Sequence, residues 1–386
     1  MIIFQHALKH NIALVSLKKT YQQSISKLTY PVLFYFTAHI ASYCSGEVLS
    51  GNNKRFKAHR FEEKTCKKDS FIYFDKHFYS SHSLNQMTEL DNRYPNLKKI
   101  GVLNNENILI KDKDHVENVV SLLLQDGFNN LQLVVDFDYT LTRGHFKNEK
   151  ALCSWGILDN SLQMPPFYRE KSQELLNKYY PIEIDPDKSE AEKIPSMVEW
   201  YSKISELLKE CNVNKKDLRE MVAQSNVKFR EDTDKLFAKL RDEDVPMLIF
   251  SAGMGDVLEH VLWHFDVYSP NVKVVSNFFK YNEEGVMVGF LGALIHMFNK
   301  NENSIHSSDY FGDLRSRSNV LLLGDSLGDV KMAVGVPPGS NVLKIGFLNH
   351  SNVTERVRAY ESAFDIVLVN DQSMAVPNSI LALIKS

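Results

Sequence analysis

The chain has few cysteines, and they form no recognisable pattern. Cys44, Cys66, Cys153 and Cys211 lie far apart in 386 residues and make no CxxC pair. Four cysteines are too few to hold a chain of this length together by disulfides, and their spacing does not suit a zinc site. We therefore expect a reducing, cytoplasmic location.

The chain also lacks a strong net charge and a long hydrophobic run. Its 45 Lys and Arg residues against 48 Asp and Glu residues leave a net charge of −3, so no basic field favours a nucleic acid polymer. The longest apolar run, residues 30–43, is interrupted by polar residues and is shorter than the roughly 20 residues of a membrane span. We expect no stable membrane insertion, no nucleic acid partner, and a monomer.

No repeat or low-complexity tract is present, and the composition, 44% hydrophobic and 24% charged, is typical of a folded globular chain. Residues 1–84 differ from the rest. Their first acidic residue is Glu47, and the segment from Arg55 to Lys68 is dense in charge. We interpret residues 1–84 as an extension or linker, and a transit peptide is the alternative.

Short apolar segments after residue 130 alternate with helical patterns. The predicted strands are residues 131–137, 246–250, 272–275, 286–291, 319–323, 341–345 and 366–369. This alternation predicts an α/β fold with a doubly wound parallel sheet. Residues 144–241 carry helical spacing with few β-branched runs, which indicates an inserted helical cap domain. The core domain would then comprise residues 85–143 and 242–386.

Two of the predicted strands end in pairs of carboxylates. Asp136 and Asp138 end the first strand, and Asp325 and Asp329 follow the strand of residues 319–323. Carboxylates at the rim of a core resist desolvation and repel one another, so a cation is expected beside them. Mg²⁺ is the hard cation that prefers such oxygens. Solvated turns or helix caps are the alternative interpretation of such pairs.

Two weaker signals accompany the carboxylates. The strand of residues 246–250 runs into Ser251, Ala252 and Gly253, a small-residue turn that offers a hydroxyl and main-chain N–H groups to an anion. Lys300 follows later in the chain, and by itself it would be interpreted as a surface lysine. Only the order of the four signals gives it a possible role in a site.

This ordered set resembles the four motifs of the haloacid dehalogenase superfamily of phosphotransferases. Within that superfamily the sequence is most similar to the cytosolic 5′-nucleotidase III family, which includes pyrimidine and 7-methylguanosine phosphate-specific enzymes. The resemblance covers roughly residues 90–386. The segments that carry the resemblance are DFDYTLTR, YYPIEIDP, MVEWY, FSAGMGDVLE, NVKVVSNF, LIHMFNK and LLLGDSLGD.

The resemblance implies a role for each motif residue. Asp136 would be the nucleophile and Asp138 the general acid and base. Mg²⁺ would be held by Asp136, the main-chain oxygen of Asp138, and Asp325. Asp329 and Thr140 would support the site, and Ser251 and Ala252 would bind the phosphate. Lys300 would neutralise charge, and Glu183 in the cap would recognise the base.

The implied function is Mg²⁺-dependent hydrolysis of a nucleoside 5′-monophosphate, either a pyrimidine nucleotide such as CMP or UMP or 7-methylguanosine monophosphate. A phosphatase of another small phosphometabolite and a nucleoside phosphotransferase are alternatives on the same site. Ile204 and Cys153 depart from the family pattern, which leaves the base preference open. Trp200 and Tyr201 fit core packing in a helical stripe, and base stacking is their alternative.

Overall fold

The computed structural model describes residues 92–147, 149–185, 187–300, 314, 316–334, 336–349 and 353–385. The extension predicted for residues 1–84 and the apolar run of residues 30–43 lie outside these ranges. Among the described residues, no helix combines the length and the apolar character that crossing a bilayer requires.

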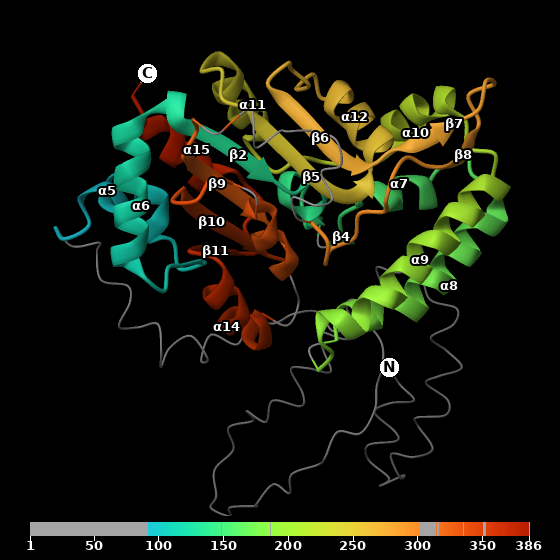
Figure 1. Cartoon of the computed structure of the whole chain (residues 1–386), viewed down its shortest axis with the longest axis horizontal. Helices are drawn as coiled ribbons and strands as arrows, with labels where there is room; N and C mark the ends of the chain where they lie inside the picture. The colour runs from blue at the N-terminus through green and yellow to red at the C-terminus, as the bar shows by residue number, and fades with distance from the viewer. Residues whose placement is uncertain are drawn as a thin grey trace, which may run out of the picture. The chain divides into compact units, whose positions relative to one another are not determined.

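A seven-stranded sheet forms the centre of the described chain (Figure 1). Its strand order is β1-β11-β10-β9-β2-β5-β6, and every pair is parallel except the edge pair β1–β11. The bounds are β1 (Ile108–Leu109), β2 (Leu131–Val135), β5 (Met247–Met254), β6 (Val272–Asn277), β9 (Asn319–Gly324), β10 (Asn341–Leu348) and β11 (Ile366–Val369). The predicted doubly wound parallel sheet is confirmed.

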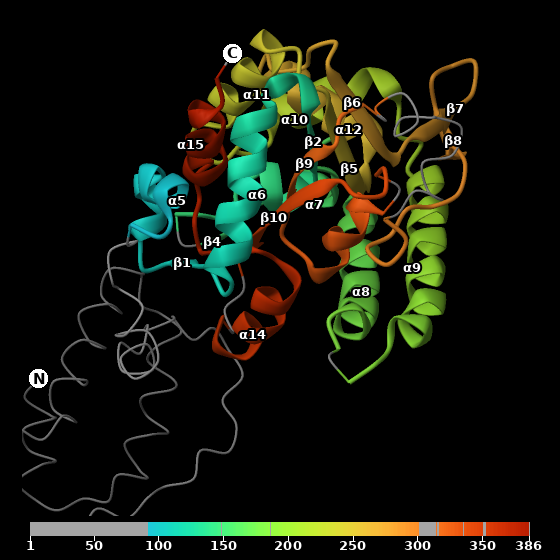
Figure 2. The ribbon, with the colours of Figure 1, turned by 60° about the vertical axis from the view of Figure 1, so that its left-hand side comes forward.

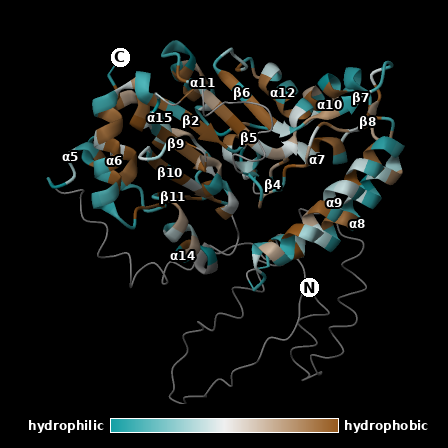
Figure 3. Cartoon of the chain, viewed as in Figure 1, coloured by the Kyte–Doolittle hydropathy of each residue, from teal (hydrophilic) through white to brown (hydrophobic). Residues whose placement is uncertain are grey.

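Helices cover both faces of this sheet, because strand side chains alternate between two apolar clusters. In β2, for example, Val135 joins one cluster and Val134 the other. The first cluster includes side chains of α6 (Lys113–Asp126), α11 (Thr233–Asp242), α12 (Gly255–His264) and α15 (Ala375–Leu383). The second includes side chains of α14 (Val353–Ala363) and the 3₁₀ helix η6 (Leu327–Ala333). Figure 3 shows the hydrophobic strands between more hydrophilic outer helix surfaces.

The chain leaves the sheet after β2 and returns before α11. The excursion holds the short strands β3 (His145–Phe146) and β4 (Glu149–Lys150), then α7 (Ser154–Asp159), α8 (Pro166–Glu183), α9 (Glu190–Glu210) and α10 (Leu218–Gln224). Its outgoing and returning segments are paired, because Arg143 N donates to Lys228 O and Arg230 N donates to Leu141 O. The long helices α8 and α9 lie side by side (Figures 1 and 2).

α11, which the sequence assigned to the cap, packs against α15. The division of the chain into cap and core stays a prediction.

One predicted strand has a different partner from the one expected. Residues 286–291 form β8 (Met287–Phe290), which pairs antiparallel with β7 (Phe279–Tyr281) in a separate two-stranded sheet. Only residues 282–286 connect β7 to β8, and a parallel pairing would need a crossover of about a dozen residues or more. The edge strand β1 was not predicted, because two residues carry no periodic pattern.

Candidate active site

The predicted site residues gather at the carboxyl edge of three adjacent strands. Asp136 follows β2, Ser251 lies within the end of β5, and Asp325 follows β9. β2 pairs with both β5 and β9, so the carboxyl ends of the three strands are neighbours. This edge is where ligands bind in open α/β sheets.

Lys300 joins two carboxylates at this edge. Its Nζ lies 2.5 Å from Asp136 Oδ1 and 2.8 Å from Asp329 Oδ1, and all three side chains are buried. Carboxylate oxygens of Asp136, Asp325 and Asp329 lie within 4.8 Å of one another. When ionised, these three carboxylates carry more negative charge than the single ammonium group of Lys300 balances. Such excess charge in a site shielded from water favours a bound cation.

The pKa values of these groups reflect burial. Burial raises the pKa of Asp136 to about 7, against the attraction of Lys300. Burial and the charges of Asp136 and Asp329 raise the pKa of Asp325 well above its usual range. Burial lowers the pKa of Lys300, but the two carboxylates that contact it more than offset this and raise the value overall. Lys300 is therefore a permanent cation in the site.

Two glycines, Gly324 and Gly328, allow the loop after β9 to pack tightly on itself and on the chain just before Lys300. A Cβ at Gly324 would lie 2.4 Å from the Cβ of Asp329, and a Cβ at Gly328 would lie 2.4 Å from the carbonyl oxygen of Met297. Asp329 Oδ2 accepts hydrogen bonds from the main-chain N and the Oγ of Ser326, both at 2.8 Å. Asp329 therefore caps η6 with one oxygen and holds Lys300 with the other.

Asp138 is not one of the three clustered acids, and the first helix of the insert holds its side chain. Its Oδ1 accepts from Ser154 N at 2.7 Å, and its Oδ2 accepts from Ser154 Oγ at 2.6 Å. Burial raises the pKa of Asp138, and the bonds from Ser154 oppose that rise. A Cβ at Gly253 would lie 2.3 Å from Ser154 Oγ and 2.9 Å from Asp138 Oδ2, so only glycine fits there without displacing them.

The small-residue turn is anchored to the segment that leads to Lys300. Gly253 N donates to Ser251 Oγ at 3.0 Å, and no acceptor takes the Ser251 hydroxyl proton among the described residues. Asn277 Nδ2 donates to Ala252 O at 3.0 Å and to Ile295 O at 2.8 Å. One asparagine therefore fixes the turn relative to the Lys300 segment, and Ser251 keeps a proton to donate.

Glu183 ends α8 and faces the same region. Burial raises its pKa to about 7, and the charges of Lys150, Lys300 and Lys193 oppose the rise. Its electrostatic neighbours therefore include Lys300 of the core and two lysines of the insert. Glu183 is a partly buried carboxylate poised to change charge near neutral pH.

The two aromatic residues singled out in α9 behave differently. Trp200 stacks on Tyr179 with ring centroids 5.8 Å apart and packs against the apolar core, as core packing predicts. Tyr201 OH donates to Ala252 O at 3.3 Å, and its ring meets Trp155 edge to face at 5.6 Å. Tyr201 thus connects α9 of the insert to the small-residue turn.

Two residues near this site were not predicted from the sequence. Ser154 was missed because nothing in its local sequence marks a hydrogen bond to a carboxylate 16 residues earlier. Lys193 was missed because it lies in a charged stretch of α9, although the structure buries it with its Nζ 5.6 Å from the ring centre of Phe298. A lysine on the apolar side of a helix was the signal that could have revealed it.

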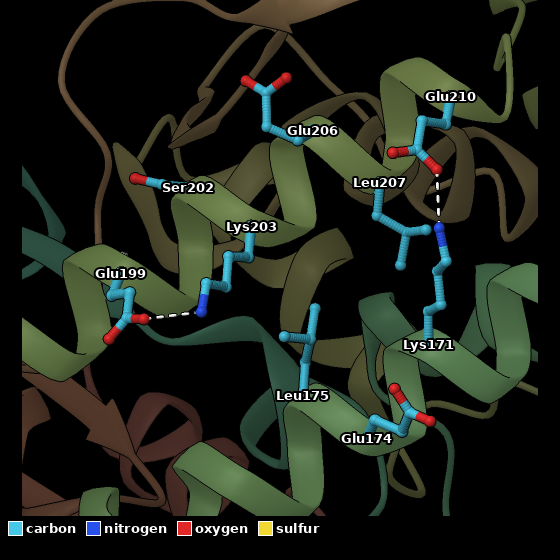
Figure 4. Close-up of a pocket in the computed structure, with 9 residues that line it drawn as sticks. All are labelled: Lys171, Glu174, Leu175, Glu199, Ser202, Lys203, Glu206, Leu207 and Glu210. Atoms are coloured by element: carbon cyan, nitrogen blue, oxygen red, sulfur yellow. Dashed lines mark hydrogen bonds and ion pairs between the residues drawn. The ribbon is translucent and has the colours of Figure 1, made fainter.

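A separate groove of about 490 Å³ lies between α8 and α9 (Figure 4). Its charged side chains form ion pairs: Lys171 with Glu210 at 2.9 Å, and Lys203 with Glu199 at 2.6 Å. These four side chains are about half exposed, so water screens them. The groove therefore lacks the buried, uncompensated charge found at the strand ends.

Comparisons with known proteins agree with this geometry. The family model described as pyrimidine 5′-nucleotidase (UMPH-1) matches residues 139–385. The Homo sapiens 7-methylguanosine phosphate-specific 5′-nucleotidase is 40% identical over 284 residues, which are 74% of this chain and 94% of that protein. The Gallus gallus protein of the same name is 42% identical over 282 residues, 73% of this chain and 97% of that one. A crystal structure of cytosolic 5′-nucleotidase IIIB bound to cytidine matches with a TM-score of 0.69 and 36% identity, covering 74% of this chain and 96% of that one.

Proposed function

The chain belongs to the pyrimidine 5′-nucleotidase (UMPH-1) family and is a 5′-nucleotidase, and from its site we propose that Asp136 is the nucleophile that removes phosphate from a nucleoside monophosphate. The observation that carries this proposal is the contact of Lys300 with both Asp136 and Asp329 at the carboxyl edge of the sheet. A phosphate monoester is a dianion, so an aspartate can approach it only where fixed cations neutralise the charge.

The acidic cluster fits a divalent cation of the hard type. Asp136 and Asp325 offer carboxylate oxygens, and the main-chain oxygen of Asp138 would add a third hard donor. Asp329 plays a supporting part, since its oxygens are engaged by Lys300, Ser326 and Asp325 N. Mg²⁺ bound there would supply positive charge that withdraws electron density from the phosphate.

In the first step, a carboxylate oxygen of Asp136 attacks the phosphorus and the bond from phosphorus to the nucleoside oxygen breaks. Asp138 gives its proton to that leaving oxygen, for which its raised pKa suits it. Lys300 neutralises charge between the nucleophile and the phosphate. The Ser251 hydroxyl and the N–H of Ala252 hold the phosphate oxygens. The products of the step are a free nucleoside and a phosphoaspartate.

In the second step, water attacks the phosphorus of the phosphoaspartate. Asp138, now ionised, takes the proton of this water, and the bond from phosphorus to Asp136 breaks. Inorganic phosphate leaves and both aspartates return to their starting state. Ser154 supports both steps, because its two hydrogen bonds keep Asp138 in one orientation while its proton is lost and regained. Thr140 is buried two residues after Asp138 and supports the loop that carries both aspartates.

Glu183 is the proposed base-recognition residue. Its carboxylate would accept hydrogen bonds from an exocyclic amine, which cytosine and 7-methylguanine both carry, and would repel the carbonyl edge of uracil. The names of the relatives support these two bases: two relatives are called 7-methylguanosine phosphate-specific, and the matching crystal structure is described as bound to cytidine. The word cytosolic in that description supports a cytoplasmic location.

Phosphate release from a panel of substrates tests the proposal. The panel comprises CMP, UMP, 7-methylguanosine monophosphate, a sugar phosphate and p-nitrophenyl phosphate, each with and without Mg²⁺. We expect CMP and 7-methylguanosine monophosphate to have the highest kcat/KM. Preference for the sugar phosphate would favour a phosphometabolite phosphatase, and a second nucleoside that gains the phosphate would reveal phosphotransferase activity.

A further inference from the structure

Arg230 is a buried arginine that the chemistry described so far does not use. It is 2% exposed and lies on the segment that returns from the insert to the sheet. Its guanidinium lies over the Phe347 ring, 3.9 Å from the ring centre. Burial lowers its pKa to about 9, the direction expected for a cation held away from water. A buried guanidinium is tolerated only where its donors are satisfied.

Those donors are directed at the loop that carries the two catalytic aspartates, residues 136–142, here called the Asp136 loop. Nε of Arg230 donates to Thr140 O at 2.7 Å, and Nη2 donates to Tyr139 O. The main-chain N of Arg230 donates to Leu141 O at 3.0 Å. One residue therefore binds three successive carbonyl groups of the Asp136 loop.

The Asp136 loop needs such an outside partner. Tyr139 has a φ of 62°, a left-handed conformation that costs a non-glycine residue roughly 1 kcal/mol or more. The carbonyl groups of Tyr139, Thr140 and Leu141 accept hydrogen bonds from Arg230 or Asn349, which lie outside the loop. Buried carbonyls without a donor are costly, so Arg230 fixes the path of the chain directly after Asp138.

The same guanidinium reaches two further loops at this edge of the sheet. Nη1 donates to Asp371 O, in the loop after β11. Nη2 also donates to Asn349 Oδ1 at 3.1 Å, and Asn349 Nδ2 donates to Tyr139 O at 3.0 Å. The Asp136 loop is thus tied to the ends of β10 and β11 through one side chain. A lysine could not reproduce this, because its single nitrogen lacks the planar fork of donors.

We propose that Arg230 is a positioning residue for catalysis: it holds the Asp136 loop in the conformation that places Asp136 and Asp138 for the two displacement steps. Arg230 is not a catalytic residue in this account, since it binds carbonyl groups of the loop and not the substrate. Its loss should lower kcat because the two aspartates would lose their fixed geometry. Substrate binding should change little, because Glu183, Ser251 and Lys300 are anchored elsewhere.

Arg317 provides a matched control within the same chain. Its Nη1 donates to Phe128 O at 2.9 Å and to Leu131 O at 2.8 Å, and its Nη2 donates to Asp244 O at 3.2 Å. The carbonyl of Leu131 is at the start of β2, at the opposite end of the strand from Asp136, and that of Phe128 lies in the turn just before it. Arg317 therefore performs a similar structural task away from the site.

The experiment compares Arg230→Lys with Arg317→Lys in the full chain, using CMP and p-nitrophenyl phosphate with Mg²⁺. We expect both variants to lose thermal stability. We expect only Arg230→Lys to lose kcat, by about tenfold to a hundredfold on both substrates, with KM for CMP within about threefold of wild type. The use of an aryl phosphate keeps the result independent of the base assignment.

Asn349→Ala is the second variant: it keeps the arginine but removes one donor to Tyr139 O and one acceptor of Arg230 Nη2. We expect it to lower kcat by about threefold to tenfold. If Arg230→Lys does not fold, this variant alone decides the matter. The proposal is overturned if folded Arg230→Lys keeps wild-type kcat, if Arg317→Lys loses kcat equally, or if Asn349→Ala leaves kcat unchanged.

Discussion

The ammonium group of Lys300 lies 2.5 Å from the carboxylate of Asp136, although 164 residues separate them in the chain. This contact brings a fixed positive charge to the proposed nucleophile. Lys300 approaches from the segment after β8, and Asn277 links this segment to the small-residue turn that we propose binds phosphate. The structure thereby provides what attack of an anion on an anion requires.

Replacement of Asp136 tests the role of the nucleophile. Asp136→Asn keeps the shape of the side chain but removes its nucleophilicity and weakens its hold on a metal. We expect kcat to fall by at least about a thousandfold, with the melting temperature nearly unchanged, because Lys300 still contacts Asp329. Activity above a few per cent of wild type, measured as phosphate release from CMP, would be incompatible with the assignment.

Replacement of Gly253 tests the position of Asp138. A Cβ there would lie 2.3 Å from Ser154 Oγ and 2.9 Å from Asp138 Oδ2, so Gly253→Ala must displace one of them. We expect kcat to fall by about a hundredfold, since misplacing a general acid by about 1 Å has an effect of that size. Gly101→Ala is the control, because a Cβ there meets no atom within 4 Å. Equal activity of the two variants would show that Asp138 has no positional role.

Replacement of Glu183 tests base recognition. Glu183→Ala removes a charge-assisted hydrogen bond worth about 1.5–3 kcal/mol, which corresponds to about a tenfold to hundredfold loss in kcat/KM for CMP. Hydrolysis of p-nitrophenyl phosphate should change little. The control is Glu170→Ala, an exposed glutamate on the same helix. Equal losses on CMP and on the aryl phosphate would mean that Glu183 maintains the cap instead of binding the base.

The raised pKa of Glu183 predicts a pH dependence of selectivity. An acid with a pKa of about 7 is mostly protonated at pH 6 and mostly ionised at pH 8. The ratio of kcat/KM for CMP to that for p-nitrophenyl phosphate should therefore rise with pH through about 7. In Glu183→Gln this ratio should not change with pH. A wild-type ratio that is flat from pH 6 to pH 8 would contradict the assignment.

The same group predicts a pH dependence of stability. The pKa of Glu183 rises from a usual value of 4.5 to about 7 on folding, so the folded state binds the proton more tightly than the unfolded state. The contribution of Glu183 to the free energy of unfolding therefore falls as pH rises from about 4.5 to about 7. Glu183→Gln should melt at a higher temperature than wild type at pH 8, with a smaller difference at pH 5. A difference independent of pH would show that Glu183 is ionised in both states.

Metal removal tests the acidic cluster. Mg²⁺ held by two carboxylates and a main-chain oxygen should bind reversibly, so EDTA should abolish phosphate release and excess Mg²⁺ should restore it. Ca²⁺ should restore less activity, because its larger radius and looser coordination do not suit the same site. Full turnover after chelation would refute the metal's role.

The sequence predicted the sheet because strands such as β2, β9 and β11 are buried throughout and so appear as continuous apolar runs. Ile366–Val369 is reproduced with the same bounds, and the Asp136 and Asp325 segments follow strands as expected. The partner of β8 was not predictable from its own pattern. Antiparallel and parallel strands of four residues look alike, and the short connection of residues 282–286 from β7 decides between them.

The site was predictable where its chemistry lies in contiguous motifs, and not where distant segments meet. Asp136 and Asp138 stand out because carboxylates rarely end a buried strand. Arg230 has no such signal: it lies in a polar segment, and its partners come from loops 90 to 141 residues away. Ser154 likewise acquires its role only when α7 folds against the Asp136 loop. Such positioning groups depend on tertiary structure, which local sequence does not encode.

The most direct test of the central claim is to trap the phosphorylated enzyme. Wild-type protein would be mixed with CMP and Mg²⁺, quenched in acid within milliseconds, and reduced with borohydride, which converts an aspartyl phosphate to homoserine. We predict homoserine at position 136 in the peptide analysed by mass spectrometry, and none in the Asp136→Asn variant. Homoserine at another aspartate, or rapid phosphate release with no modified residue at any quench time, would contradict the account.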